Sequence, residues 1–102
     1  MTAMRACAVV PTYDNPQTIE AVVERIRSHL PDVFVVDDGS GTAGRLACEA
    51  LASTGRAHVV RHAQNRGKGA AVRTALAAAQ AAGFSHAFQI DADGQHDLEA
   101  IP

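Results

Sequence analysis

Short apolar runs alternate with amphipathic segments along this chain, and the alternation predicts strands separated by helices. The strand-like runs are almost continuously apolar, which is typical of strands buried on both faces of a sheet. They cover Arg5–Val10, Val33–Val36, Ala57–Val60 and Ser85–Ile90. Strands that alternate with helices in this order are typical of a parallel sheet with crossover connections. We therefore expect an α/β fold.

The first helix carries the clearest signals at its ends. Asn15 is a suitable N-cap, Pro16 suits the first helical position, and Pro31 ends the helix. Its apolar positions, which recur with helical spacing, are Ile19, Val22, Val23, Ile26 and Leu30.

Two further helices are expected after polar connections. A turn from Asp37 to Gly44 leads into a helix over about Arg45–Ser53. A basic loop, Arg61–Lys68, leads into a helix from about Gly69 to Ala82. The expected packed face of that last helix is Val72, Ala75, Leu76 and Ala79. The whole pattern predicts a Rossmann-like parallel sheet with crossover helices.

Composition and charge narrow the class of protein. At 102 residues and 47% hydrophobic content, the chain is at most one domain and is suited to a globular fold. The net charge of −2 gives no basic excess, so no nucleic-acid partner is expected. The stretch Ala70–Ala82 is too short to span a bilayer, and no signal peptide is indicated. We expect a cytoplasmic protein with Cys7 and Cys48 as buried, reduced thiols.

An acidic pair follows the last predicted strand. Asp91 and Asp93 stand two residues apart, so in an extended chain both side chains point the same way. Two carboxylates on one side suit a hard divalent cation such as Mg²⁺ or Mn²⁺. The alternative is that the two residues cap a helix and form a turn.

The other strands also end in polar segments, which would meet at the carboxyl edge of a parallel sheet. Asp37–Ser40 could bind a base or ribose, or it could simply cap the following helix. Lys68 could meet a phosphate or base, although its loop lacks the pattern of a Walker A motif. His62 is expected to be solvated in that loop, and the scattered histidines do not form a zinc site.

Together these segments resemble the N-terminal half of family 2 glycosyltransferases with the GT-A fold. The resemblance is nearest to dolichyl- or polyprenyl-phosphate sugar synthases. The matching segments, in the family's order, are 9–13, 35–40, 65–71 and 89–96. Asp14-Asn15 stands where many members have Asn-Glu. The resemblance implies that residues 1–102 form the nucleotide-sugar-binding part of the domain, with the acceptor-binding half absent.

The resemblance also implies roles for individual residues. Asp91 and Asp93 would hold Mg²⁺ or Mn²⁺ on the diphosphate of a UDP- or GDP-sugar, with Asp38 on the base. The implied nucleotide-sugar-binding residues are Pro11, Thr12, Tyr13, Asn15, Asp38, Lys68, Ala92 and Gln95. Transfer would invert the anomeric centre, and no catalytic base is identified. The acceptor would be a polyprenyl phosphate or another glycan or lipid, which suits peripheral membrane association of a full-length protein at the inner face.

Other classes of protein remain open from the residues. A signalling receiver domain also places acids at strand ends, but its acidic pair follows the first strand. A non-catalytic nucleotide-binding module, or a nucleotidyltransferase, would use a similar sheet. The implied glycosyltransferase further predicts that the isolated chain binds a sugar nucleotide weakly without turning it over.

Overall fold

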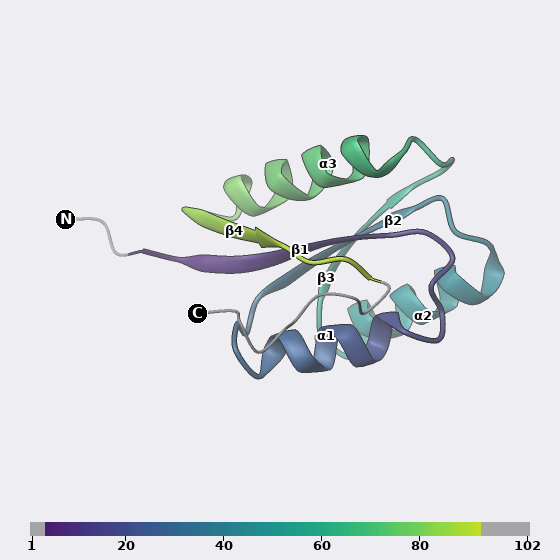
Figure 1. Ribbon diagram of the computed structural model, residues 1–102, viewed down its shortest axis with the longest axis horizontal. Coiled ribbons are helices and arrows are strands. Elements are labelled where there is room, and N and C mark those ends of the chain that lie inside the picture. Colours follow the sequence, from purple (N-terminus) through teal and green to yellow (C-terminus); the bar gives the residue numbers. More distant parts are fainter. Residues whose placement is uncertain (1–3, 93–102) are drawn as a thin grey trace.

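The fold is a three-layer α/β/α arrangement (Figure 1). The computed structural model describes residues 4–92. Its elements are β1 (Ala6–Thr12), α1 (Ile19–Arg27), β2 (Val33–Asp38), α2 (Thr42–Ser53), β3 (His58–His62), α3 (Lys68–Ala81) and β4 (His86–Gln89). The strand and helix order expected from the sequence is therefore confirmed.

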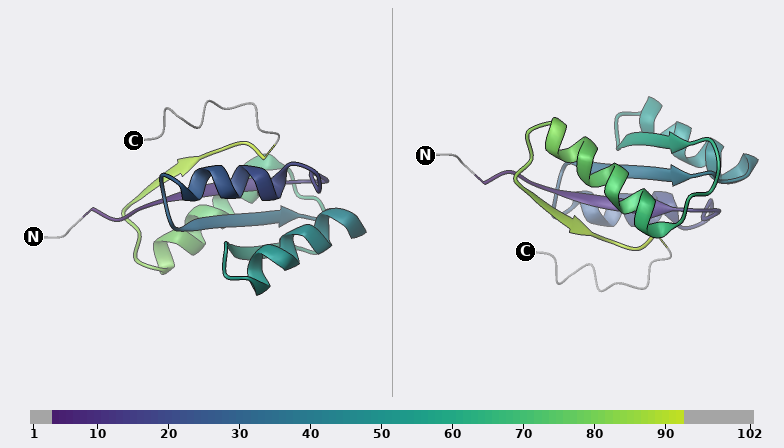
Figure 2. Two further views of the ribbon diagram at one scale, coloured as in Figure 1. Left: turned by 90° about the horizontal axis from the view of Figure 1, so that it is seen from below. Right: turned by 90° about the horizontal axis from the view of Figure 1, so that it is seen from above.

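The sheet is parallel throughout, with the strand order β3-β2-β1-β4. The chain first builds outward from β1 to β3 and then returns to place β4 on the other side of β1. Because each crossover keeps the same hand, this reversal puts α1 and α2 on one face and α3 on the other. Figures 1 and 2 show the two helices below the sheet and the single helix above it.

Alternating side chains of the inner strands form two separate cores. In β2, Val33 and Val35 pack with α1 and α2, whereas Phe34 and Val36 pack with α3. The continuous apolar run of β2 follows from this burial on both faces. Cys48 and Cys7 are free thiols in opposite cores, as expected. Burial, reinforced by the Asp37 charge, raises the pKa of Cys48 to about 12.

The second crossover and the start of α3 differ from the prediction at their polar ends. Arg61 and His62 belong to β3, which the sequence analysis ended at Val60. Asp37 and Asp38 are strand residues, and α2 begins at Thr42. The predicted polar turn and basic loop are therefore both shorter than expected, because strand pairing continues beyond the apolar run.

The start of α1 was also predicted incorrectly. The helix begins at Ile19 with Thr18 as N-cap, after a turn over 16–18. The Asn15 carbonyl accepts hydrogen bonds from the N–H groups of Thr18 and Ile19. Its side chain points back toward β1 and donates to Thr12 Oγ1 and the Tyr13 carbonyl. Asn15 therefore closes the turn instead of capping a helix.

The packed face of α3 is narrower than the sequence suggested. Ala71, Ala75 and Ala79 lie against the sheet, whereas Leu76 is 43% exposed. The alanines are four residues apart and form one row along the helix. Small side chains on this row let the helix lie close to β1 and β2. Within residues 4–92, no helix has the length and apolar character needed to cross a membrane.

Candidate functional site

A cavity of about 390 Å³ opens at the carboxyl ends of β1 and β4. This is the point where the strand order reverses direction, and ligands of open parallel sheets bind at such a point. The volume is within the range of small-molecule sites. Its lining residues are Pro11, Thr12, Tyr13, Asn15, Asp38, Asn65, Gly67, Lys68, Ala71, Asp91 and Ala92.

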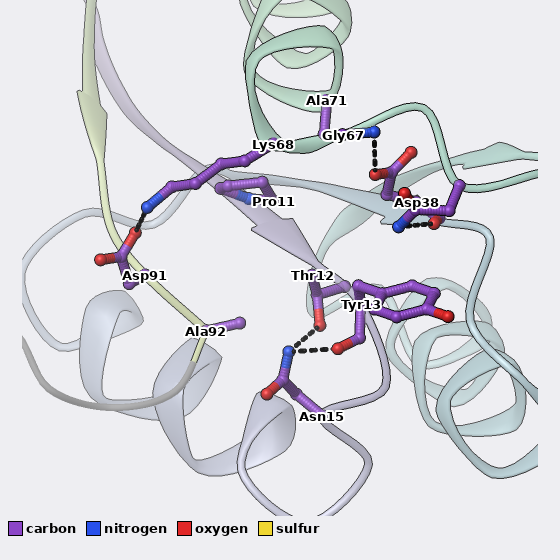
Figure 3. A pocket seen from close by; sticks show the side chains of 11 residues that line it. Pro11, Thr12, Tyr13, Asn15, Asp38, Gly67, Lys68, Ala71, Asp91 and Ala92 are labelled. Carbon is purple, nitrogen blue, oxygen red and sulfur yellow. Dashed lines mark hydrogen bonds and ion pairs between the residues drawn. The ribbon is translucent and has the colours of Figure 1, made fainter.

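Most of the residues selected from the sequence meet around this cavity. They come from the end of β1, the end of β2, the start of α3 and the segment after β4, which are distant in the chain (Figure 3). The selected residues brought together are Pro11, Thr12, Tyr13, Asn15, Asp38, Lys68, Asp91 and Ala92. Asp93 and Gln95 lie outside the described residues. The sequence analysis did not select Asn65, Gly67 or Ala71.

Asp37 and Asp38 have different surroundings, because adjacent strand residues face opposite sides of the sheet. In the parallel register, Asp37 lies opposite Arg61 and Asp38 opposite His62. Asp37 Oδ2 pairs with Arg61, and Oδ1 accepts a hydrogen bond from the Ser40 N–H. Asp37 therefore stabilises the β2–α2 turn on the α1–α2 face of the sheet, away from the cavity.

Asp38 faces α3 and ties two loops together. Its carboxylate accepts hydrogen bonds from the N–H groups of Arg66 and Gly67, each at 2.9 Å. Burial by itself would raise the pKa of Asp38, but the hydrogen bonds from the His62 ring and these two N–H groups outweigh it. The pKa lies below its ordinary value, so Asp38 is ionised at neutral pH.

The expectation that His62 is solvated is wrong. The residue is 7% exposed, and its ring lies between Asp38 and Thr74 of α3. The sequence analysis ended β3 two residues early, which placed His62 in a loop. Extending the strand by these two residues would have put His62 beside Asp38, which is the signal that was missed.

Lys68 and Asp91 form an ion pair across the cavity. Lys68 Nζ lies 2.7 Å from Asp91 Oδ1, which is itself shielded from solvent. Figure 3 shows this pair on one side of the cavity and Asp38 with Tyr13 on the other. The cavity therefore has an end where opposite charges meet and an end that combines a half-exposed aromatic ring with a carboxylate.

The loop after β1 is fixed to the loop after β2. Asp14 has a φ of 54°, which is uncommon for a residue other than glycine. Its N–H donates to Ser40 Oγ at 2.9 Å, and its carboxylate accepts from the Gly41 N–H at 2.7 Å. Asp14 therefore orients the loop that carries Tyr13, and it does not line the cavity.

Metal-ligand chemistry in the described part of the chain is limited to single side chains. Within residues 4–92, no three His, Cys, Asp or Glu side chains come together in a group that could hold a metal ion. Asp91 is the cavity-lining member of the acidic pair predicted from the sequence.

Comparison with known proteins identifies the family. The sequence model described as glycosyl transferase family 2 matches residues 7–102, and the chain belongs to this family. It is therefore a glycosyltransferase by family, and the receiver-domain alternative is excluded.

Two curated relatives are specific about their chemistry by name. The chain is 37% identical over 102 residues to the polyprenol monophosphomannose synthase of Mycolicibacterium smegmatis, covering 95% of the chain and 38% of the relative. It is 32% identical over 103 residues to the undecaprenyl-phosphate mannosyltransferase of Micrococcus luteus, covering 97% of the chain and 42% of the relative. The chain thus spans about two fifths of the length of these relatives.

The fold also matches a solved structure. The crystal structure of S. aureus TarS superposes with a TM-score of 0.70 at 24% identity, over 88% of this chain and 17% of that chain. The expected GT-A type of parallel α/β fold is confirmed.

Proposed function

We propose that this chain supplies the donor-binding part of a metal-dependent enzyme that transfers a sugar from a nucleoside-diphosphate sugar to a polyprenyl phosphate, with inversion. The observation that carries the proposal is the two-ended cavity at the strand-order reversal. Its aromatic and acidic end suits a nucleobase, and its charged end suits a diphosphate with its counter-ion. The names of the two curated relatives support a lipid-phosphate acceptor and a mannosyl group.

The base would lie at the end formed by Tyr13 and Asp38. The Tyr13 side chain is half exposed, so its ring is accessible for stacking on a base. An ionised carboxylate offers about four lone-pair sites. Three hydrogen bonds already reach Asp38 from within the protein, which leaves capacity for a base N–H group.

The diphosphate and a divalent ion would lie at the end formed by Lys68 and Asp91. Asp91 Oδ1 already lies next to a cationic nitrogen, and carboxylate oxygen is the ligand type that Mg²⁺ and Mn²⁺ prefer. The residues present therefore fit such an ion, with Asp91 and Asp93 as its proposed protein ligands. When bound, the ion would neutralise charge on the leaving diphosphate. Gln95 is proposed to lie near the same phosphates.

The acceptor half of the reaction would be supplied by residues beyond those that form this cavity. The acids at the cavity are committed to the donor, so we propose that residues 1–102 bind the sugar nucleotide weakly and do not turn it over. The lipid-phosphate acceptor further suggests that the complete enzyme acts at the cytoplasmic face of a membrane.

Calorimetric titration with UDP and GDP, each with and without Mn²⁺, tests the proposed donor site. We expect one nucleotide to bind, with an affinity that falls at least about tenfold when Mn²⁺ is removed. Asp91→Asn should abolish the effect of Mn²⁺. Asp32→Asn is the matched control, since it removes an exposed carboxylate that does not line the cavity. If neither nucleotide binds the wild-type chain in the presence of Mn²⁺, the proposal is wrong.

A further inference from the structure

His62 is a buried polar side chain that the proposed function leaves unused. Its Nδ1 lies 2.8 Å from Asp38 Oδ1, and its Nε2 lies 2.8 Å from Thr74 Oγ1. The ring therefore connects the end of β2, through the end of β3, to the second turn of α3. It does not line the cavity.

The chemistry of its neighbours decides where the proton on His62 lies. An ionised carboxylate can only accept hydrogen bonds, so Nδ1 carries a proton and donates to Asp38. In the neutral ring, Nε2 then accepts from the Thr74 hydroxyl; in the imidazolium it would donate to the Thr74 oxygen. In both states the bond to Asp38 keeps its direction, and the ring orientation is fixed from both sides.

The carboxylate that His62 holds is the anchor of the β3–α3 loop. Besides receiving the N–H groups of Arg66 and Gly67, Asp38 accepts a hydrogen bond at its carbonyl from Asn65 Nδ2 at 3.2 Å. This loop leads directly into Lys68. The orientation of the Asp38 carboxylate therefore influences both ends of the cavity, its own end and the end at Lys68.

We propose that His62 is a positioning residue of the donor site, which holds the Asp38 carboxylate in the orientation needed for the base and for the loop that carries Lys68. The inference rests on the proposed function. A side chain that is fixed before the ligand arrives loses less conformational freedom on binding, so the pair contributes to affinity without touching the ligand.

Substitutions at His62 separate this role from general packing. Asn carries an amide N–H at the δ position, as histidine does, so His62→Asn retains a donor toward Asp38. His62→Gln carries its amide one bond further out, toward Thr74, and His62→Leu has no donor. We expect nucleoside-diphosphate affinity to fall at least about tenfold in His62→Leu and His62→Gln. In His62→Asn it should stay within about threefold of wild type.

The free energy of unfolding, measured by urea titration, is the accompanying readout, and binding is compared under conditions where each variant is folded. Thr74→Val is the matched control, because it removes the other hydrogen bond of the ring and leaves the bond to Asp38. It should lower stability with little effect on affinity.

Two results would overturn the inference while the proposed function stands. One is wild-type affinity in both His62→Gln and His62→Leu. The other is an affinity in His62→Asn as low as in His62→Gln, which would mean that the δ-position donor has no special role. Failure of the wild-type chain to bind any nucleoside diphosphate would instead remove the proposed function and this inference together.

Discussion

The residues of the cavity are held by charges and hydrogen bonds that any ligand must share or replace. Lys68 is the only lysine in the sequence, and its ammonium group already contacts the carboxylate proposed to bind a divalent ion. Ion and ammonium group would compete for the same oxygen of Asp91. The ammonium group freed in this way could then meet a phosphate.

Removing the Lys68 charge tests this competition. We expect Lys68→Met to bind Mn²⁺ alone about three to ten times more tightly than wild type, because Asp91 loses its competing partner. The same variant should bind the nucleoside diphosphate more weakly. Mn²⁺ affinity can be measured by the relaxation of water protons. Arg66→Met is the control, since it removes a charge from the same loop at a side chain that does not line the cavity. Equal or weaker Mn²⁺ binding by Lys68→Met would argue against the competition.

The ionised state of Asp38 makes a second prediction, for stability against pH. Because its pKa is lower in the folded than in the unfolded chain, acid favours unfolding. Its contribution is fully present above the unfolded value near 3.8 and is lost as the pH falls through the folded value. We expect Asp38→Asn to be about 1–3 kcal/mol less stable at neutral pH. Urea unfolding at several pH values should show the gap closing in acid, since a protonated carboxyl group resembles an amide. A gap independent of pH would contradict this.

At the scale of elements, the two loops beside the cavity are pressed together at Gly39. This residue has a φ of +80°, and a Cβ added to it would lie 2.4 Å from the backbone nitrogen of Asn65. The β2–α2 and β3–α3 loops therefore touch through their backbones, and only glycine permits both the contact and the conformation.

Gly39→Ala should therefore be among the more damaging substitutions in the chain. We expect a loss of about 2–4 kcal/mol in the free energy of unfolding, measured with urea. Gly55→Ala is the matched control: its φ is +73°, but nothing lies within 4 Å of the added Cβ. It should cost about 1 kcal/mol from backbone strain. Equal losses in the two variants would show that the close contact is not important.

The elements also show how far the sequence could be interpreted. The apolar runs and helical spacing identified every strand and helix, because burial on two faces leaves a strong pattern. The ends were harder. Arg61 and His62 extend β3 as polar residues, and only their register against Asp37 and Asp38 explains them. Hydrophobic pattern carries no information about register, so the pairing of acids with bases on the neighbouring strand could not be foreseen.

For the whole molecule, the described sheet ends at β4 in a strand with little protection. His86, Ala87 and Gln89 are exposed, and a second hollow of about 420 Å³, between α3 and this edge, includes Leu76 and Phe84. Edge strands without charged residues are prone to pair with other chains. The isolated chain should therefore self-associate as its concentration rises.

A charge on the edge strand should reduce this association. We expect Ala87→Lys to shift the sedimentation profile toward the monomer at high protein concentration, with a change in unfolding free energy of no more than about 0.5 kcal/mol. Glu49→Lys, on α2, adds positive charge elsewhere and serves as the control for a general effect of charge. Self-association unchanged by Ala87→Lys but reduced by Glu49→Lys would contradict a role for the β4 edge.

The walls of the cavity come from the two ends of the described chain, with Pro11 on β1 and Asp91 just after β4. During synthesis, the early strands and their helices could emerge from the ribosome and pair long before Asp91 does. The nucleotide pocket would be completed only with the last strand, so a nascent chain could capture no donor until then. A donor analogue bound to nascent chains of increasing length would therefore report the moment at which the sheet is finished.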